Sequence, residues 1–165
     1  MEINIYMRYA AIIPNDCING EGVCVSVWMQ GCPHRCKGCH NADMWDFQGG
    51  NEESEIEVIN KIKTALSANG VNRNLSILGG EPLCKENIRN TALIVLYTKI
   101  NHPDSKIFLW TGYTIDEIPN NFPYSVIKEY VDVIIDGPYL ENERDTSLKL
   151  RGSSNQRILK QGIDF

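Results

Sequence analysis

Three cysteines within eight residues constrain the fold and chemistry of this sequence more than any other feature. Cys32, Cys36 and Cys39 have the spacing C-x-x-x-C-x-x-C, with Gly31 before the first and Gly38 before the third. A loop with these glycines can turn tightly enough to direct three thiolates towards one point. Thiolates are soft ligands that suit zinc, copper(I) and iron–sulfur clusters, so this stretch predicts a metal centre.

The spacing alone leaves the identity of the metal open. Structural zinc sites and closed iron–sulfur sites normally have four protein ligands. Either a fourth ligand comes from elsewhere, for example His34 or His40 at a zinc ion, or one metal position stays open for a substrate. A disulfide framework would need an oxidising compartment. The first residues show no charged region followed by an apolar core, so we expect reduced thiols and a cytoplasmic location.

Length and composition predict a single domain that spans residues 1–165, with the cysteine loop at 31–41. The chain has 165 residues, of which 42% are hydrophobic and 22% charged, as is usual for a globular protein. The net charge of −5 argues against general nucleic-acid binding, which depends on a basic surface. The longest apolar run, residues 92–97, is far too short to cross a membrane. We therefore expect neither nucleic acid nor a membrane as a partner.

Hydrophobic periodicity and turn residues predict an alternation of strands and helices. Strands are expected over residues 23–30, 75–78, 106–110 and 131–135, after a short extended segment over 5–13. Helices are expected over 55–67, 86–100 and 123–130, with irregular chain over 41–53. Ser54 with Glu57, and Thr114 with Glu117, have the spacing of capping boxes at helix starts. Such alternation is typical of an α/β fold with a parallel sheet and crossover helices.

The periodicity also assigns the apolar faces of the two longer helices and limits the fold. The first face carries Ile56, Ile59, Ile62 and Leu66, and the second carries Ile88, Ala92, Leu93, Leu96 and Ile100. A complete (β/α)8 barrel takes about 250 residues, so this chain is long enough for only part of one. The predicted fold is therefore α/β, a partial (β/α) barrel with a mostly parallel sheet.

Four of the predicted strands end at turns that contain glycine, namely Gly31, Gly79-Gly80, Gly112 and Gly137. In a parallel sheet these ends lie at one edge, so we expect the cysteine loop and the other three turns to line one cleft. In Gly79-Gly80-Glu81-Pro82, two residues without a Cβ let a ligand approach the backbone closely. Glu81 adds a carboxylate that suits a positively charged amino group.

The cysteine motif together with Gly79-Gly80-Glu81-Pro82 resembles the radical S-adenosylmethionine enzyme superfamily. A closer resemblance, from about residue 9 to about residue 157, is to the activating proteins of class III anaerobic ribonucleotide reductases. It is carried by Trp110-Thr111-Gly112-Tyr113, by residues 133–137 and by Arg151-Gly152-Ser153-Ser154-Asn155-Gln156. Asn15-Asp16, Asn19-Gly20, Gly22 and Trp45 also correspond. Two positions depart from the usual pattern: His40 stands where Tyr or Phe is common, and Glu21 where Pro is common.

The resemblance implies a ligand set and a cosubstrate site. Cys32, Cys36 and Cys39 would ligate a [4Fe–4S] cluster whose fourth iron binds S-adenosyl-L-methionine. The cosubstrate would lie beside Gly38, Cys39 and His40, with its amino group held by Gly79, Gly80 and Glu81. No catalytic residue beyond the cluster is expected. The role of residues 151–156 stays open.

The resemblance also implies a reaction and its partners. A flavodoxin-type donor would reduce the cluster, and S-adenosylmethionine would be cleaved to methionine and a 5′-deoxyadenosyl radical. That radical would remove a hydrogen atom from a glycine of the large subunit of the anaerobic ribonucleotide reductase, which then stores a glycyl radical. Two alternatives remain: a small radical enzyme that acts on a metabolite, as carboxy-deazaguanine synthases do, and a non-catalytic binding module stabilised by zinc.

The remaining cysteines and the tryptophans receive simpler predictions. Cys17, Cys24 and Cys84 are expected to be buried as small apolar residues, because free cysteine is among the most buried residue types. Trp28, Trp45 and Trp110 are expected to be packing residues.

Overall fold

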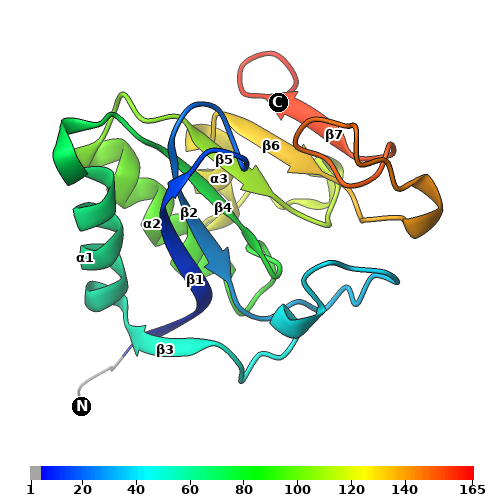
Figure 1. Ribbon diagram of the computed structural model, residues 1–165, viewed down its shortest axis with the longest axis horizontal. Coiled ribbons are helices and arrows are strands. Elements are labelled where there is room, and N and C mark those ends of the chain that lie inside the picture. The colour runs from blue at the N-terminus through cyan, green and yellow to red at the C-terminus, as the bar shows by residue number, and fades with distance from the viewer. Residues whose placement is uncertain (1–4) are drawn as a thin grey trace.

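The computed structural model describes residues 5–165, which form one seven-stranded sheet and three α-helices (Figure 1). The strands are β1 (Tyr6–Asp16), β2 (Cys24–Met29), β3 (Asn51–Ser54), β4 (Asn74–Gly79), β5 (Ile107–Trp110), β6 (Val133–Asp136) and β7 (Arg157–Lys160). The helices are α1 (Glu55–Leu66), α2 (Ile88–Asn101) and α3 (Tyr124–Tyr130). Short 3-10 turns lie at Ala42–Met44, Ala68–Gly70, Ile115–Glu117 and Glu141–Glu143. None of the helices within residues 5–165 has the length and apolarity that a membrane crossing requires.

The sheet has a parallel centre and antiparallel edges. Its strand order is β3-β1-β2-β4-β5-β6-β7, in which β2, β4, β5 and β6 run parallel to one another. Strands β1, β3 and β7 are added antiparallel at the two ends. The predicted α/β class and the parallel strands are confirmed. The sheet is open, with β3 and β7 as its edges, so it is not a closed barrel.

The two faces of the sheet have different roles. Alternate strand residues such as Val27, Ile77 and Leu109 belong to a hydrophobic core that also contains the buried side chains of all three helices. Crossovers between parallel strands are right-handed, which brings the helices to the same face of this centre. The neighbouring strand residues Trp28 and Leu78 point to the other face, because side chains alternate along a strand. All three α-helices found within residues 5–165 pack on the first face, which leaves the second face available for a site.

Helix positions agree with the predictions, but two residues were wrongly assigned to the buried apolar faces. The buried residues of α1 are Val58, Ile62, Ala65 and Leu66, whereas Ile56 is 69% exposed. Two residues correspond to about 200° around a helix, so Ile56 lies almost opposite Val58. Ile100 is likewise 75% exposed at the end of α2. The capping box of Ser54 and Glu57 is present and starts α1.

Two edge strands were not predicted. Residues 41–53 were expected to be irregular, but they contain a 3-10 turn and most of β3, which pairs with β1 from Tyr6↔Ser54 to Tyr9↔Asn51. Strand β7 pairs with β6 from Val133↔Lys160 to Asp136↔Arg157. In both cases the strand forms because the neighbouring strand offers backbone hydrogen-bond partners, whereas its own sequence shows little apolar pattern that could predict it.

Candidate metal centre and cleft

A cleft of about 440 Å³ lies at the edge where the parallel strands end. That volume is in the usual range for a small-molecule site. Cys32, Cys36 and Cys39 contribute to its lining, as predicted. The strand-end turns contribute Gly79, Gly80, Glu81, Thr111, Gly112 and Gly137, and the C-terminal part of the chain contributes Tyr139, Leu148, Leu150, Arg151, Gly152 and Gln156. The predicted meeting of the cysteine loop with the glycine turns is therefore confirmed.

The cysteine loop is shaped by its own turns and by backbone contacts with residues 44–45. The amide of Cys39 donates to the carbonyl of Cys36 at 3.1 Å, and Gly38 between them has φ +74°, a conformation that favours glycine. The amide of Gly31 donates to the carbonyl of Met44 at 2.8 Å. The amide of Cys32 donates to the carbonyl of Trp45 at 3.2 Å. These contacts hold the start of the loop in a fixed place.

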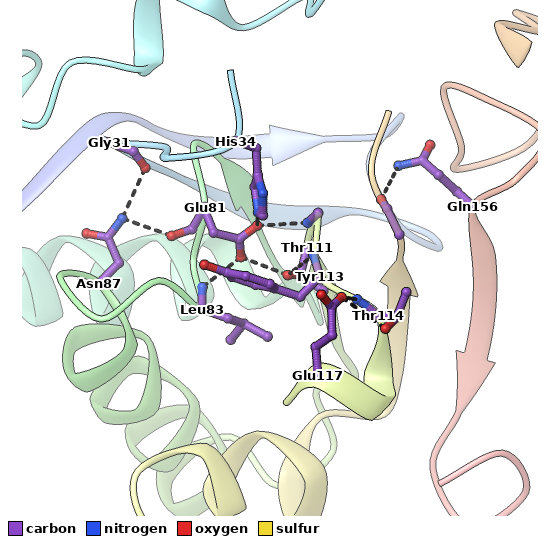
Figure 2. Close-up of polar contacts among 12 residues, drawn as sticks. Gly31, His34, Glu81, Leu83, Asn87, Thr111, Tyr113, Thr114, Glu117 and Gln156 are labelled. Carbon is purple, nitrogen blue, oxygen red and sulfur yellow. Dashed lines mark hydrogen bonds and ion pairs between the residues drawn. The ribbon is translucent and has the colours of Figure 1, made fainter. Parts of the chain in front are cut away.

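The turn after β4 lies directly against the start of the cysteine loop. The amide of Gly80 donates to the carbonyl of Met29 at 2.8 Å, and the amide of Glu81 donates to that of Gly31 at 2.9 Å. A Cβ on Gly80 would lie 2.4 Å from the carbonyl oxygen of Gly31, so only glycine fits. The buried side-chain amide of Asn87 donates to the carbonyls of Gln30 and Glu81, both at 3.0 Å. It also reaches the carbonyl of Gly31 at 3.3 Å, and Figure 2 shows its contacts with Gly31 and Glu81.

The carboxylate of Glu81 is buried and fully engaged with protein groups. Its side chain is 1% exposed. Oε1 accepts from the hydroxyl of Thr111 at 2.8 Å and from the amide of Leu83 at 2.9 Å. Oε2 accepts from the amide of Gly112 at 2.7 Å and lies 2.7 Å from Nε2 of His34 (Figure 2). The hydrogen bond to Glu81 raises the pKa of His34 against the opposing effect of burial.

The thiols of the loop are not arranged as ligands of one ion. Burial raises the pKa of Cys32 to about 11 and also raises the pKa of Cys36, so a bound metal would have to favour their thiolates. Among residues 5–165, no three Cys, His, Asp or Glu side chains lie close enough together to hold one metal ion. A zinc site requires donors within about 2.3 Å of one ion, whereas each thiolate of a [4Fe–4S] cluster binds a different iron.

The residues predicted to surround the cosubstrate do not all face the cleft. Cys39, Gly79 and Gly80 line it. His40 also lines it, is exposed, and meets the ring of Tyr139 edge-on at 5.7 Å between centroids. Gly38 is not among the lining residues; a Cβ at this position would lie 2.6 Å from the carboxylate of Glu141.

Several cleft residues were missed or misjudged from the sequence. Trp28, Trp45 and Trp110 were expected to be packing residues, but all three are half-buried and line the cleft. Their positions at or just beyond the ends of β2 and β5 and the cysteine loop were the available signal. Of the three remaining cysteines, Cys24 and Cys84 are buried as predicted, while Cys17 is exposed because it lies in the turn after β1.

Comparison with known proteins identifies the family. Residues 18–159 match the model of the 4Fe-4S single cluster domain. The chain is 37% identical, over 156 residues, to the anaerobic ribonucleoside-triphosphate reductase-activating protein of Haemophilus influenzae, a match that covers 92% of this chain and 97% of that protein. The protein of the same name from Enterobacteria phage T4 is 36% identical over 152 residues, with 92% and 93% coverage.

The similarity extends to a further relative of this name. The protein from Escherichia coli strain K12 is 32% identical over 156 residues, which cover 92% of this chain and 97% of that protein. The matches span almost the whole length of both partners and include the cysteine loop. The chain therefore belongs to the family of anaerobic ribonucleoside-triphosphate reductase-activating proteins and carries its 4Fe-4S single cluster domain.

Proposed function

We propose that this protein is a radical S-adenosylmethionine activase that generates a glycyl radical on the large subunit of an anaerobic ribonucleotide reductase. Its relatives are named as activating proteins of that reductase. The observation that supports this function most strongly is the placement of three cysteine thiols in one cleft, beside glycine turns that leave the backbone accessible. The whole chain, residues 1–165, would act as one such domain.

The donor set fits a [4Fe–4S] cluster with one position free of protein ligands. Cys32, Cys36 and Cys39 line the same cleft and supply three soft thiolates, which these clusters prefer. When bound, the cluster supplies the electron that cleaves S-adenosylmethionine into methionine and a 5′-deoxyadenosyl radical. The difficult chemistry belongs to the cofactors, so the protein needs no general acid or base.

The residues of this chain bind and orient the cosubstrate and limit its contact with water. Gly79 and Gly80, with the main chain of Glu81, would hold the amino group at the end of β4. Cys39 and His40 would lie beside the methionine or adenine part, with Gly38 shaping the turn between the last two thiolates. Trp28 and Trp110 also line the cleft and provide apolar surface, which would shield the adenosyl group and the target glycine from water.

The architecture agrees with an incomplete barrel. Helices cover one face of the parallel centre, and the cleft lies over the other face, as in a (β/α) barrel whose remaining strands are absent. The open side of such a barrel would admit the glycine-bearing loop of the reductase. A flavodoxin-type protein is the proposed electron donor, and free cysteines throughout the chain support a cytoplasmic location.

Two alternatives have distinct chemical requirements. A radical enzyme acting on a metabolite would use the same cleft and cluster, but it would release a modified small molecule. A zinc-stabilised binding module would need four donors around one ion, which the described side chains do not gather.

The test is a glycyl-radical assay under anaerobic conditions. Reconstituted protein, a reductant, S-adenosylmethionine and the cognate large subunit should produce a glycyl radical signal by EPR, together with 5′-deoxyadenosine. A colourless protein with one zinc per chain would contradict the cluster assignment. Cleavage of S-adenosylmethionine without any radical on the reductase would contradict the activase function and favour the metabolite alternative.

A further inference from the structure

We propose that Glu81 and His34 are positioning residues that lock the cysteine loop onto the ends of β4 and β5, and that the Glu81 carboxylate is not a ligand of the cosubstrate. The inference depends on the proposed function only because it takes the cysteine loop to hold the proposed cluster. It changes what the glutamate of Gly79-Gly80-Glu81-Pro82 does, because the sequence suggested that its carboxylate would meet an amino group.

The carboxylate of Glu81 has no acceptor position left. An ionised carboxylate offers about four lone-pair sites on its two oxygens. In this structure Thr111 and Leu83 occupy Oε1, while Gly112 and His34 occupy Oε2. The side chain is 1% exposed, so it is closed to solvent as well. An ammonium group could bind this carboxylate only by displacing one of the four partners.

The four partners of the Glu81 carboxylate come from three separate segments of the chain. Leu83, Thr111 and Gly112 belong to the turns after β4 and β5, which fix the carboxylate in place. His34 comes from the cysteine loop and is two residues from both Cys32 and Cys36. Fixing the His34 side chain therefore fixes the course of the chain between two predicted cluster ligands. Figure 2 shows His34 reaching down to the carboxylate that Thr111 holds from the other side.

The surroundings of His34 are shaped for its imidazole ring. Tyr113 meets the ring edge-on, with 4.6 Å between centroids. Gly112 leaves the space that the ring occupies, since a Cβ there would lie 2.6 Å from a ring carbon of His34. A buried carboxylate that loses one partner is destabilised strongly, so this contact should hold the loop firmly.

The direct test uses metal-free protein and amide hydrogen exchange, so it needs neither cosubstrate nor reductase. His34→Leu removes the donor to Oε2, whereas His34→Gln keeps a side-chain N–H that can reach it. We expect exchange in residues 31–41 to rise on the order of tenfold in His34→Leu, as loss of a hydrogen bond to a buried charged group predicts. His34→Gln should restore most of the protection. His102→Gln, at the half-buried C-cap of α2, is the matched control and should change nothing in the loop.

A second measurement follows release of iron from the reconstituted cluster to a chelator. Loss of an outer-shell partner typically costs about 10–100-fold in metal affinity, so His34→Leu should release iron roughly tenfold faster than wild type. Gly112→Ala should have the same effect, because its methyl group displaces the ring without altering either partner. Glu81→Gln should open the same segment in metal-free protein.

The proposal has clear contradicting outcomes. It is wrong if the loop of wild-type metal-free protein already exchanges at the unprotected rate, or if His34→Leu leaves loop exchange and iron release unchanged. Equal behaviour of His34→Leu and His34→Gln would also overturn it. If Glu81→Gln weakens S-adenosylmethionine binding while leaving loop exchange as in wild type, the carboxylate is a cosubstrate ligand instead. None of these results would decide whether the reductase is the partner.

Discussion

The two walls of the cleft are held in place by different means. The first wall consists of the cysteine loop at 31–41 with the turns at 79–83 and 111–113, and its centre is the buried carboxylate of Glu81. The second wall, residues 137–156, is held by amide and backbone contacts. Asn155 donates to the carbonyl of Pro138 at 2.7 Å, and Trp110 donates to that of Leu150 at 2.8 Å. Two buried polar atoms of this wall, Arg151 Nε and Asn155 Oδ1, have no protein partner.

The amide of Gly137 in the second wall donates to the carbonyl of Tyr113 in the first at 2.9 Å, but the side-chain contacts between the two walls are weak. Lys37 and Glu141 form an ion pair at 3.6 Å, but the Lys37 side chain is 90% exposed, and exposed pairs of this kind contribute little. His40 and Tyr139 meet edge-on at 5.7 Å. The difference predicts a rigid wall around the three cysteines and a second wall that can adapt. We expect the second wall to yield when the reductase loop enters, because locally weak segments open first.

The largest expected effect comes from removing one of the proposed cluster ligands in the first wall. Cys36→Ser should lower iron content well below four per chain for a [4Fe–4S] cluster and abolish cleavage of S-adenosylmethionine. Outer-shell changes cost about 10–100-fold, so loss of a ligand should cost more than about 100-fold. Iron analysis and 5′-deoxyadenosine formation measure both. Cys17→Ser, which changes an exposed side chain that does not line the cleft, is the control. Full activity of Cys36→Ser would refute the ligand set.

The next effect compares one glycine from each wall. Neither Gly80 nor Gly152 has a left-handed φ, so the methyl group of an alanine tests space alone. Gly80→Ala would press against the backbone of Gly31 and Met29 and should destabilise the protein by about 1–3 kcal/mol or more. Gly152→Ala meets only the side chains of Tyr139 and Gln156 and should change stability by less than about 0.5 kcal/mol. Urea unfolding measures both, and equal values would remove the distinction between the walls.

A smaller, local effect is expected in the second wall. Asn155→Ala removes the hydrogen bond to Pro138 and should cost about 1 kcal/mol. Amide exchange should rise in residues 137–156 and stay unchanged in 31–41. Faster exchange in both segments would show that the walls are coupled, contrary to their weak contacts.

The smallest effect is expected from a change at the N-terminus of α1, which lies away from the cleft. Ser54→Ala breaks the capping box of α1 and should lower Tm by about 2–4 °C without changing activity. Hydrogen bonds from Ser54 lower the pKa of Glu57 in the folded protein below its ordinary value of 4.5. The stabilisation from this cap is therefore fully present at pH values above 4.5, and it is lost as the pH falls through the pKa of Glu57 in the folded state. The Tm difference between wild type and Ser54→Ala should therefore shrink in acid. A change in activity at neutral pH would mean that global stability, not local contacts, controls the cleft.

The parts of the fold that carry strong local signals could be predicted from the sequence. The helices can be predicted from their hydrophobic periodicity and from the Ser54–Glu57 capping box. The central strands can be predicted from apolar runs that end at glycine. Strands β3 and β7 could not be found in this way. Residues 51–54 are Asn-Glu-Glu-Ser, and they form a strand only because the edge of β1 offers backbone partners.

The same contrast holds within the site. The three cysteines and Gly80 follow from motif and spacing, since metal binding and close backbone approach require those residue types. The partnership of His34 with Glu81 joins residues that are 47 positions apart, and neither residue reveals the other in the sequence. The cleft position of Trp28 depends on which face of the sheet the helices cover, which becomes visible only when the strands are assembled.

The measurement that tests the central claim most directly is EPR of the reduced, reconstituted protein before and after addition of S-adenosylmethionine. If three thiolates leave one iron open to the cosubstrate, binding at that iron should change the g values of the reduced cluster. An unchanged spectrum, while equilibrium binding shows that S-adenosylmethionine occupies the protein, would contradict an open iron position in this cleft.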